Sequence, residues 1–281
     1  MSEDGIRTAP LGTRWVRKMA IIIVVLLAFG SWGLYDAVSV YPARGERYAR
    51  WAELQYLEAA QRANGEDFGI FERDTSVPNP REEYERLNEP ERKRTNLADS
   101  ANTSSTRHLR ASMQVARLNW LESLKRIGQL KPERTTFENP RARLEALRQE
   151  VSATATPKPL AGYDIPSQWA IMGVCWCIAL VMMVHFVRVA SRKYRWDPTR
   201  KALTIPGGAT IVPDDLAEVD KRKWDKFIVF LRIKEGRQPL GGQEVRVDLY
   251  QHAELEDWVL AMEREAFGPQ EEGGDAEAPA G

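Results

Sequence analysis

Residues 165–187 read IPSQWAIMGVCWCIALVMMVHFV, a run of 23 residues that contains no Asp, Glu, Lys or Arg. A helix rises 1.5 Å per residue, so this run makes a helix about 34 Å long, enough to cross a hydrocarbon core of about 30 Å. Four cations follow it: Arg188, Arg192, Lys193 and Arg195. Because cytoplasmic flanks are enriched in Lys and Arg, the sequence predicts a transmembrane helix over residues 165–188 that ends in the cytoplasm.

A second uncharged run, MAIIIVVLLAFGSWGLY, covers residues 19–35, and apolar residues after Asp36 extend it to Tyr41. Basic residues precede it, which favours a cytoplasmic N-terminal tail over residues 1–18. A cleaved signal peptide is the alternative, but the bulky Trp32, Leu34 and Tyr35 suit a peptidase site poorly. We therefore expect a two-pass protein of the bacterial inner membrane, with both termini in the cytoplasm and the lipid bilayer as its first partner.

The composition excludes several classes of protein. Lys plus Arg and Asp plus Glu both number 40, so the net charge is zero and nothing favours binding to nucleic acid. The only cysteines, Cys175 and Cys177, lie in the second apolar run, so no disulfide framework is expected. Their thiols would project about 200° apart on a helix, which disfavours metal binding by both. Thiols in mid-span are also badly placed for palmitoylation, so apolar packing is favoured.

Residues 42–164 form the predicted extracytoplasmic domain, which is helical. Helices are expected over 46–63, 81–88, 91–130 and 141–151, with an irregular connection over 66–80 and a linker over 152–160. Arg44, Arg47 and Arg50 lie beside the first span and oppose a simple charge count, but long loops translocate largely regardless of charge.

The apolar stripes of these helices are narrow. Such helices pack as an elongated antiparallel bundle, or as a coiled coil with another chain, which leaves a homo-oligomer open. Two interpretations of this domain remain: a spacer that packs on itself, and a module that senses a signal or binds a partner. Asn102-Thr103-Ser104 matches a glycosylation acceptor, which we take as coincidence.

The pattern changes to short strands after Ser191. Strands are expected over 193–197, 202–205, 209–212, 227–234 and 244–250, with a helical turn or loop over 213–219. A helix over 253–267 follows, with Leu255, Trp258, Val259 and Met262 as its buried face. Residues 269–281 are acidic and rich in Gly and Ala, which predicts a disordered tail. The fold class is therefore α+β, with a small strand barrel or sandwich capped by a helix.

A resemblance to a known family lies in three stretches: RWDPTRKALTIPGG at residues 195–208, KRKWDKFIVFLRI at 221–233 and VRVDLYQHAELEDWVLAME at 245–263. Together they resemble the bacterial pleckstrin-homology-like domains, over residues 193–268. In that family a paired-strand sandwich or barrel ends in a helix that plugs its open end. The resemblance implies a binding or oligomerising module and not an enzyme.

Two basic clusters in this region are the candidate site. The resemblance implies lipid-headgroup contact by the first hairpin, and a second cluster lies further along the chain: Arg195, Arg200 and Lys201, then Lys221, Arg222 and Lys223. Each cation near an anionic leaflet can contribute about 1 kcal/mol. The alternative is that these residues are solvated faces and topology signals, because Asp214, Asp215, Asp220 and Asp225 neighbour the second cluster.

No motif for catalysis, a cofactor or a metal is present in the sequence. We therefore expect a non-enzymatic adaptor or scaffold whose C-terminal module contacts a protein partner in a membrane complex. A transmembrane sensor that couples the outer helices to that module is the alternative. An enzyme subunit has the least support.

Overall fold

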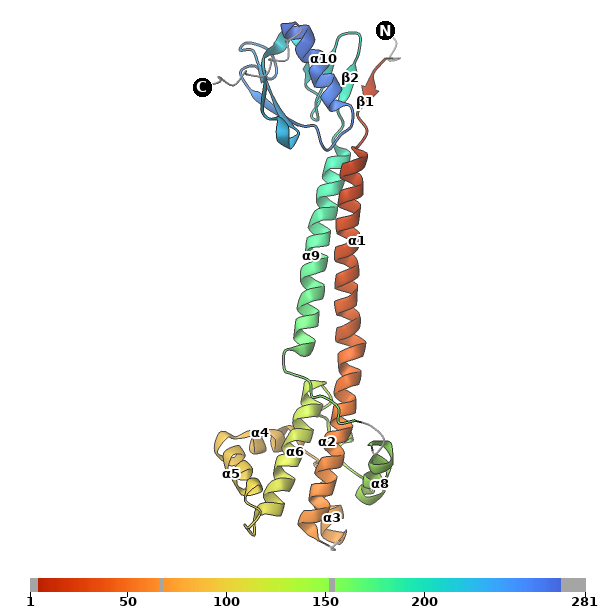
Figure 1. The fold of residues 1–281 in the computed structure, drawn as a ribbon, viewed down its shortest axis with the longest axis vertical. Helices are drawn as coiled ribbons and strands as arrows, with labels where there is room; N and C mark the ends of the chain where they lie inside the picture. Colours follow the sequence, from red (N-terminus) through yellow and green to blue (C-terminus); the bar gives the residue numbers. More distant parts are fainter. Residues whose placement is uncertain (1–4, 66–67, 152–154, 269–281) are drawn as a thin grey trace, which may run out of the picture. The chain divides into compact units, whose positions relative to one another are not determined.

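The computed structural model describes residues 5–65, 68–151 and 155–268. The chain divides into two compact units, and each contains part of both long helices (Figure 1). Met1–Ala28 with Cys175–Gly281 is called the sheet unit here, and Phe29–Val174 the helical unit. Residues 152–154 of the predicted linker and the predicted disordered tail, 269–281, lie outside the described residues.

Both uncharged runs form helices that are long and apolar enough to span a membrane: α1, Thr13–Tyr35, and α9, Asp164–Ser191. Only 6% of the most apolar stretch of α9 is buried, against 17% for the first helix. A core helix of a soluble domain would bury such a surface. The exposed apolar side chains therefore have no cover within the described residues.

The first helix continues beyond its apolar run. A π-helical segment, η1 at Asp36–Val40, leads directly into α2 at Tyr41–Asn64, where a shorter helix over 46–63 was expected. The indole of Trp32 donates to Asp36 Oδ2 over 3.1 Å, so the first charged residue after the run has a partner one turn earlier. Gly65, with a φ of 62°, ends α2 at the predicted position.

The helical unit is built on three helices: α2, α6 at His108–Arg126 and α8 at Pro140–Val151. Their buried side chains include Leu57, Leu121, Leu144 and Leu147, each at most 1% exposed. The Tyr56 ring stacks on Trp120 at 5.1 Å between centroids, and neither is exposed. The narrow predicted stripes thus converge on one core. Four short helices complete the described part of the unit: α3, Phe68–Thr75; α4, Pro80–Asn88; α5, Pro90–Ala101; and α7, Pro132–Thr135.

Two predictions of secondary structure in this unit are wrong. The connection over 66–80, expected to be irregular, contains α3 at Phe68–Thr75, because Phe71 is buried and the Tyr56 hydroxyl donates to the Thr75 carbonyl over 2.7 Å. The helix over 91–130 is two helices, α5 at Pro90–Ala101 and α6. Side-chain oxygens of Asn102 and Ser105 accept backbone N–H groups two residues on, which forms a turn between them.

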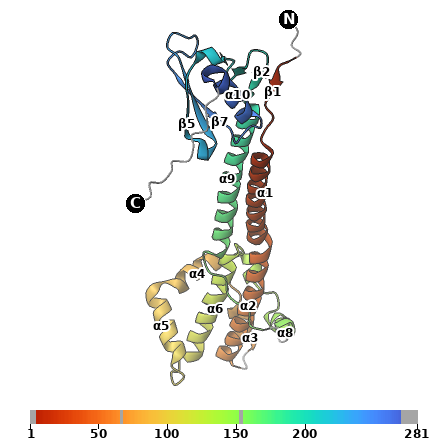
Figure 2. The ribbon, with the colours of Figure 1, turned by 45° about the horizontal axis from the view of Figure 1, so that its top comes forward.

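The sheet unit contains two antiparallel sheets (Figure 2). The first has the order β1-β2-β3-β4, and its strands are Arg7–Thr8, Arg195–Asp197, Ala202–Thr204 and Thr210–Ile211. The second has the order β5-β6-β7, with strands Leu216–Lys223, Ile228–Ile233 and Glu244–Asp248. The five predicted strands are confirmed with shorter ends, and Pro213–Asp215 is the expected helical turn, η2.

Strand β5 falls partly in the region predicted as a turn or loop. Its pairing with β6 contains two register irregularities, and a strand with such irregularities need not alternate regularly between apolar and polar residues. The sequence of β5 therefore lacks the pattern that identifies a strand. Leu216 is fully buried and Val219 packs on the core, which holds the strand in place.

The last helix, α10 at Leu255–Phe267, buries the predicted face. Leu255, Trp258, Val259 and Met262 are at most 5% exposed. The Trp258 ring stacks on Trp196 of β2 with 5.8 Å between centroids, which joins α10 to the first sheet.

Strand β1 comes from the segment before the first apolar helix. Residues 5–12 have no alternating pattern, and the sequence does not predict this strand. Arg7 pairs with Trp196, and the Ala9 N–H donates to the Tyr194 carbonyl over 2.9 Å. Further along, Gly12 donates to the Gln251 carbonyl over 2.9 Å and Pro10 accepts from Ala253 over 2.8 Å. The N-terminal segment is therefore an integral part of the sheet unit.

The same unit holds the adjoining ends of α1 and α9. Trp15, Met19 and Val189 form a small buried cluster, and Trp15 stacks on Phe186 at 5.3 Å between centroids. His252 lies between these helix ends and the sheets: it is 2% exposed and bridges to Leu11, and its Nε2 lies 3.1 Å from the Arg192 carbonyl. Burial lowers its pKa, although that hydrogen bond and Asp248 act in the opposite direction.

Replacement of Gly12 by Ala tests the seating of the N-terminal segment. A Cβ there would lie 2.7 Å from the Tyr250 carbonyl oxygen, so we expect the free energy of unfolding to fall by about 1–3 kcal/mol. Gly5→Ala is the matched control, since a Cβ at Gly5 meets no atom within 4 Å, and it should change stability by less than about 0.5 kcal/mol. Chemical denaturation of the full chain in detergent measures both. Equal stabilities would contradict the docking of residues 9–12.

The pKa of His252 predicts a pH dependence. Because folding lowers this pKa below 6.5, the unfolded chain binds the proton more readily, and stability is lost as pH falls below 6.5. The slope from this one group cannot exceed about 1.4 kcal/mol per pH unit. Unfolding measured between pH 5 and 8 should be flatter for His252→Gln than for the natural chain; parallel curves would exclude His252 as the source.

Candidate functional site

The six predicted basic residues lie on different elements of the sheet unit. Arg195 is exposed on β2, and Arg200 and Lys201 lie in the turn between β2 and β3. Lys221, Arg222 and Lys223 lie at the end of β5, in the other sheet. The structure therefore divides the set between the two sheets.

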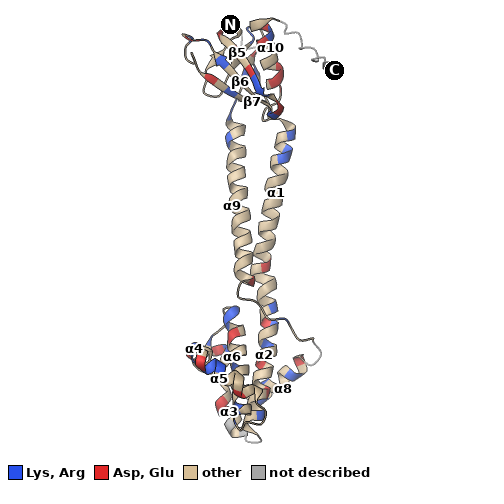
Figure 3. Cartoon of the chain, turned by 60° about the vertical axis from the view of Figure 1, so that its left-hand side comes forward, with Lys and Arg blue, Asp and Glu red and all other residues tan. Residues whose placement is uncertain are grey.

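Within the described residues, half of these cations have carboxylate partners. Lys201 pairs with Glu265, and Lys221 Nζ lies 2.7 Å from Glu263 Oε2, so both clusters reach glutamates of α10. Arg222 pairs with Glu244 at 2.8 Å and also lies over the Phe230 ring. Figure 3 shows the resulting mixture of positive and negative residues over this unit. Lipid-headgroup contact by the six stays a prediction.

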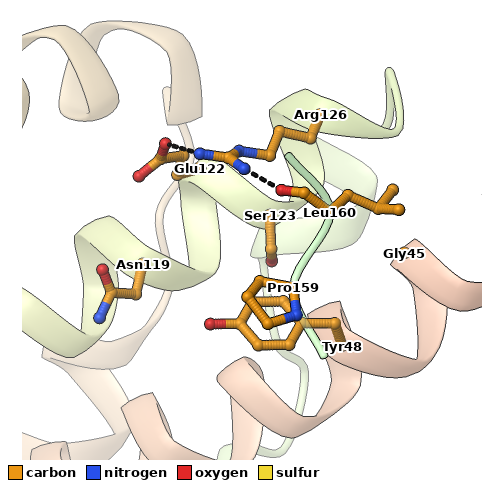
Figure 4. Close-up of a pocket in the computed structure, with 8 residues that line it drawn as sticks. All are labelled: Gly45, Tyr48, Asn119, Glu122, Ser123, Arg126, Pro159 and Leu160. Atoms are coloured by element: carbon orange, nitrogen blue, oxygen red, sulfur yellow. Dashed lines mark hydrogen bonds and ion pairs between the residues drawn. The ribbon is translucent and has the colours of Figure 1, made fainter. Parts of the chain in front are cut away.

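A cavity of about 230 Å³ lies in the helical unit (Figure 4). Helix α2 contributes Gly45 and Tyr48, and the segment before α9 contributes Pro159 and Leu160. The remaining wall belongs to α6: Asn119, Glu122, Ser123 and Arg126. Glu122 and Ser123 lie three and four residues after Asn119, and Arg126 lies four and three residues after them, which places the four along one side of the helix.

Gly45 allows the segment at Pro159–Leu160 to approach α2. A Cβ at this position would lie 2.3 Å from Ile127 Cγ2 and 2.6 Å from Leu160 Cδ1. Leu160 is 3% exposed, and its carbonyl accepts a hydrogen bond from Arg126. Arg126 in turn pairs with Glu122 over 2.6 Å. A glycine and one arginine thus hold the Pro159–Leu160 segment over the cavity.

The polar groups of the cavity suit binding. Burial raises the pKa of the Tyr48 phenol, with Arg126 lowering it and Glu122 raising it to smaller extents, so the phenol remains a hydrogen-bond donor at neutral pH. Asn119 adds an amide that both donates and accepts. Ser123 already donates to the Trp120 carbonyl over 2.6 Å. The cavity can therefore receive a small polar group between Tyr48 and Asn119.

The sequence patterns do not predict a site at any of these residues. Gly45 lies just before the helix predicted over 46–63 and inside the observed α2, where a glycine is a signal that another segment packs closely. The polar spacing of Asn119, Glu122 and Arg126 was a second signal, but solvent-facing helices show the same spacing. Only the position of Leu160 over these residues, which the sequence does not give, distinguishes the wall of a cavity from a solvent-facing helix.

A second buried polar group in this unit is structural. Arg117 donates to the Tyr56 hydroxyl over 3.1 Å, to Glu83 over 2.9 Å and to the Asp74 carbonyl over 2.7 Å. Burial opposes ionisation of Glu83, but hydrogen bonds from Arg86 and Arg117 outweigh it and lower its pKa. The arginine is fully engaged in joining helices, as buried charges require.

In the part of the chain that the structure describes, no group of three or more His, Cys, Asp or Glu side chains could hold a metal ion. Cys175 and Cys177 are free thiols on α9. Comparison of the chain with protein-family models, curated proteins and solved structures found no match. The function of the chain must therefore be inferred from its own geometry.

Replacement of Gly45 by Ala tests the cover of the cavity. In an open helix this change stabilises by about 1 kcal/mol, whereas here the added methyl collides with Leu160 and Ile127. We expect the free energy of unfolding to fall by about 1–2 kcal/mol. Gly162→Ala, which meets no atom within 4 Å, serves as control. A stabilised Gly45→Ala chain, measured by chemical denaturation, would show that Leu160 does not rest on α2.

Proposed function

We propose that this chain is a two-pass, non-enzymatic membrane adaptor whose sheet unit lies in the cytoplasm and contacts a protein partner. The observation that carries the proposal is the pairing of β1, which precedes the first apolar helix, with β2, which follows the second. Two strands of one sheet lie on one side of a bilayer. Both ends of the chain are then on the same side, as two crossings require.

The basic flanks give that side its identity. Arg14, Arg17 and Lys18 precede the first apolar run and Arg188 follows the second, which favours the cytoplasm. The same pairing supports a retained first span. Cleavage of a signal peptide would remove β1 and the buried Ala9 from the sheet unit.

The sheet unit is proposed to be of the pleckstrin-homology-like type. This assignment is supported by two antiparallel sheets, one of four strands and one of three. The helix that follows them, α10, packs on both. A partner-binding role is supported by Phe227, which is 48% exposed and has a φ of 56°. A bulky residue is rarely found in this left-handed conformation, and strained, exposed residues are concentrated at binding sites.

Transmembrane signalling is the second candidate. Leu160, which covers the cavity, lies four residues before the start of α9, and α9 ends at Ser191 beside the sheet unit's Tyr194. A ligand that displaced Leu160 would act on the first turn of α9. This short connection between Leu160 and α9 is the observation that favours a transmembrane sensor as the second candidate function.

Cysteine labelling tests the topology. In a chain with Cys175 and Cys177 replaced by Ala, single cysteines are introduced as Leu97→Cys in α5 and Phe267→Cys in α10, both at exposed positions. A membrane-impermeant maleimide added to intact cells should label position 97 and should label position 267 only after permeabilisation. The reverse pattern, or equal labelling, would overturn the proposal.

Hydrogen exchange of the full chain separates the two candidates. Leu160→Ala opens the cavity cover, and a transducer should respond with altered exchange in β2 that a Gly-Gly insertion after Arg192 abolishes. An adaptor should confine the change to the helical unit. Gly162→Ala is the matched control next to the same segment, and an effect of equal size in that variant would remove Leu160 from the mechanism.

A further inference from the structure

We infer that Arg44, Arg47 and Lys158 form a binding site for a phosphate-bearing anion in the helical unit, at the end of α2 that follows the first apolar run. The inference rests on the proposed membrane insertion for its depth but not for its charge. These arginines oppose the simple charge rule for the outer side, and an anionic ligand gives them a role.

The site is a second pocket of about 430 Å³. Helix α2 contributes Arg44, Arg47, Arg50 and Trp51, and α8 contributes Glu150. Pro157 and Lys158 lie on the segment that leads to α9. Elements far apart in the sequence thus place their cations around one hollow. Trp51 is half-buried and offers an apolar wall beside them.

The charges of the pocket are unequal. Arg50 is neutralised, because Glu150 binds its guanidinium at 2.5 Å and Glu46 at 3.5 Å. No described carboxylate pairs with Arg44, Arg47 or Lys158, and the side-chain hydrogen bond that Arg44 donates to the Pro159 carbonyl is long, at 3.5 Å. Three cations thus surround the hollow without a counter-ion in the described chain.

Arg44 and Arg47 are three residues apart on α2, so their like charges repel each other. An anion bound between them would replace this repulsion with attraction. Guanidinium groups present paired donors that match the oxygens of a phosphate, and Lys adds a point charge. A phosphate group therefore fits this donor set better than a single carboxylate, which two of the three cations would satisfy.

The depth of the pocket matches the phosphate layer of a bilayer. The chain is helical from Thr13 to Asn64, so Arg44 and Arg47 lie about 4.5 Å and about 9 Å along the axis beyond Tyr41, where the predicted span ends. The headgroup layer extends about 5–8 Å beyond the hydrocarbon core on each side. A lipid phosphate is therefore within reach, and a soluble phosphate is the other source of the same chemistry.

Native mass spectrometry of the full chain in mild detergent tests the site with phosphatidylglycerol, and calorimetry tests it with inorganic phosphate. We expect Arg44→Gln, Arg47→Gln and Lys158→Gln together to weaken binding at least about tenfold. The matched control removes three exposed charges from the α5–α6 hairpin: Arg94→Gln, Arg107→Gln and Arg110→Gln. It should change binding less than twofold.

Loss confined to the pocket variant supports the site, and the arm in which it occurs identifies a lipid or a soluble source. Equal loss in the control, or no binding in either arm, overturns it. If the triple variant does not fold, Arg47→Gln with Lys158→Gln, both exposed positions, should still weaken binding about threefold or more. The phosphate arm needs no bilayer, so its failure is distinct from a failure of the cysteine labelling.

Discussion

The antiparallel pairing of β1 with β2 is the constraint on which the sheet unit depends. It joins two segments that flank both apolar helices and the helical unit in the chain. Three further backbone hydrogen bonds, from Ala9, Gly12 and Ala253, extend the contact beyond the two-residue strand, and Ala9 reaches the core. Since backbone groups buried without partners are costly, this short segment is fixed at several points.

The two units are stabilised in different ways. The sheet unit relies on apolar packing around Trp196 and Trp258, with ion pairs such as Arg222–Glu244 outside this core. The helical unit adds a buried polar network, in which Arg117 connects Tyr56, Glu83 and the Asp74 carbonyl. Removal of one member of such a network leaves the others buried and unpaired, so it specifies the arrangement of helices more strongly than a leucine core alone.

Much of this architecture follows from sequence periodicity. The apolar runs, the strand at Ile228–Ile233 and the buried face of α10 have strong patterns, and the structure bears them out as helices and strand. Strand β1 is too short to alternate, and β5 has register irregularities, so neither had a readable pattern. The break after Ala101 depends on side-chain capping in a stretch whose helical spacing continues through it.

The candidate sites could be predicted less well, because they depend on contacts between distant residues. Gly45 and Leu160 are far apart in the sequence and come close only in the folded chain. Arg47 and Lys158 are similarly distant in the sequence but line the same pocket. The basic clusters of the sheet unit looked similar in sequence, but the glutamates that pair with them, Glu263 and Glu265, lie on α10. A count of neighbouring charges along the chain does not reveal partners from another element.

The split origin of the first sheet has a consequence for biogenesis. The ribosome makes Arg7 and Thr8 before the first apolar helix, and their partners at Arg195–Asp197 emerge only after the second. The nascent chain must therefore keep its first strand unpaired until both apolar helices have been made. Completion of the first sheet would then mark that both helices have left the ribosome.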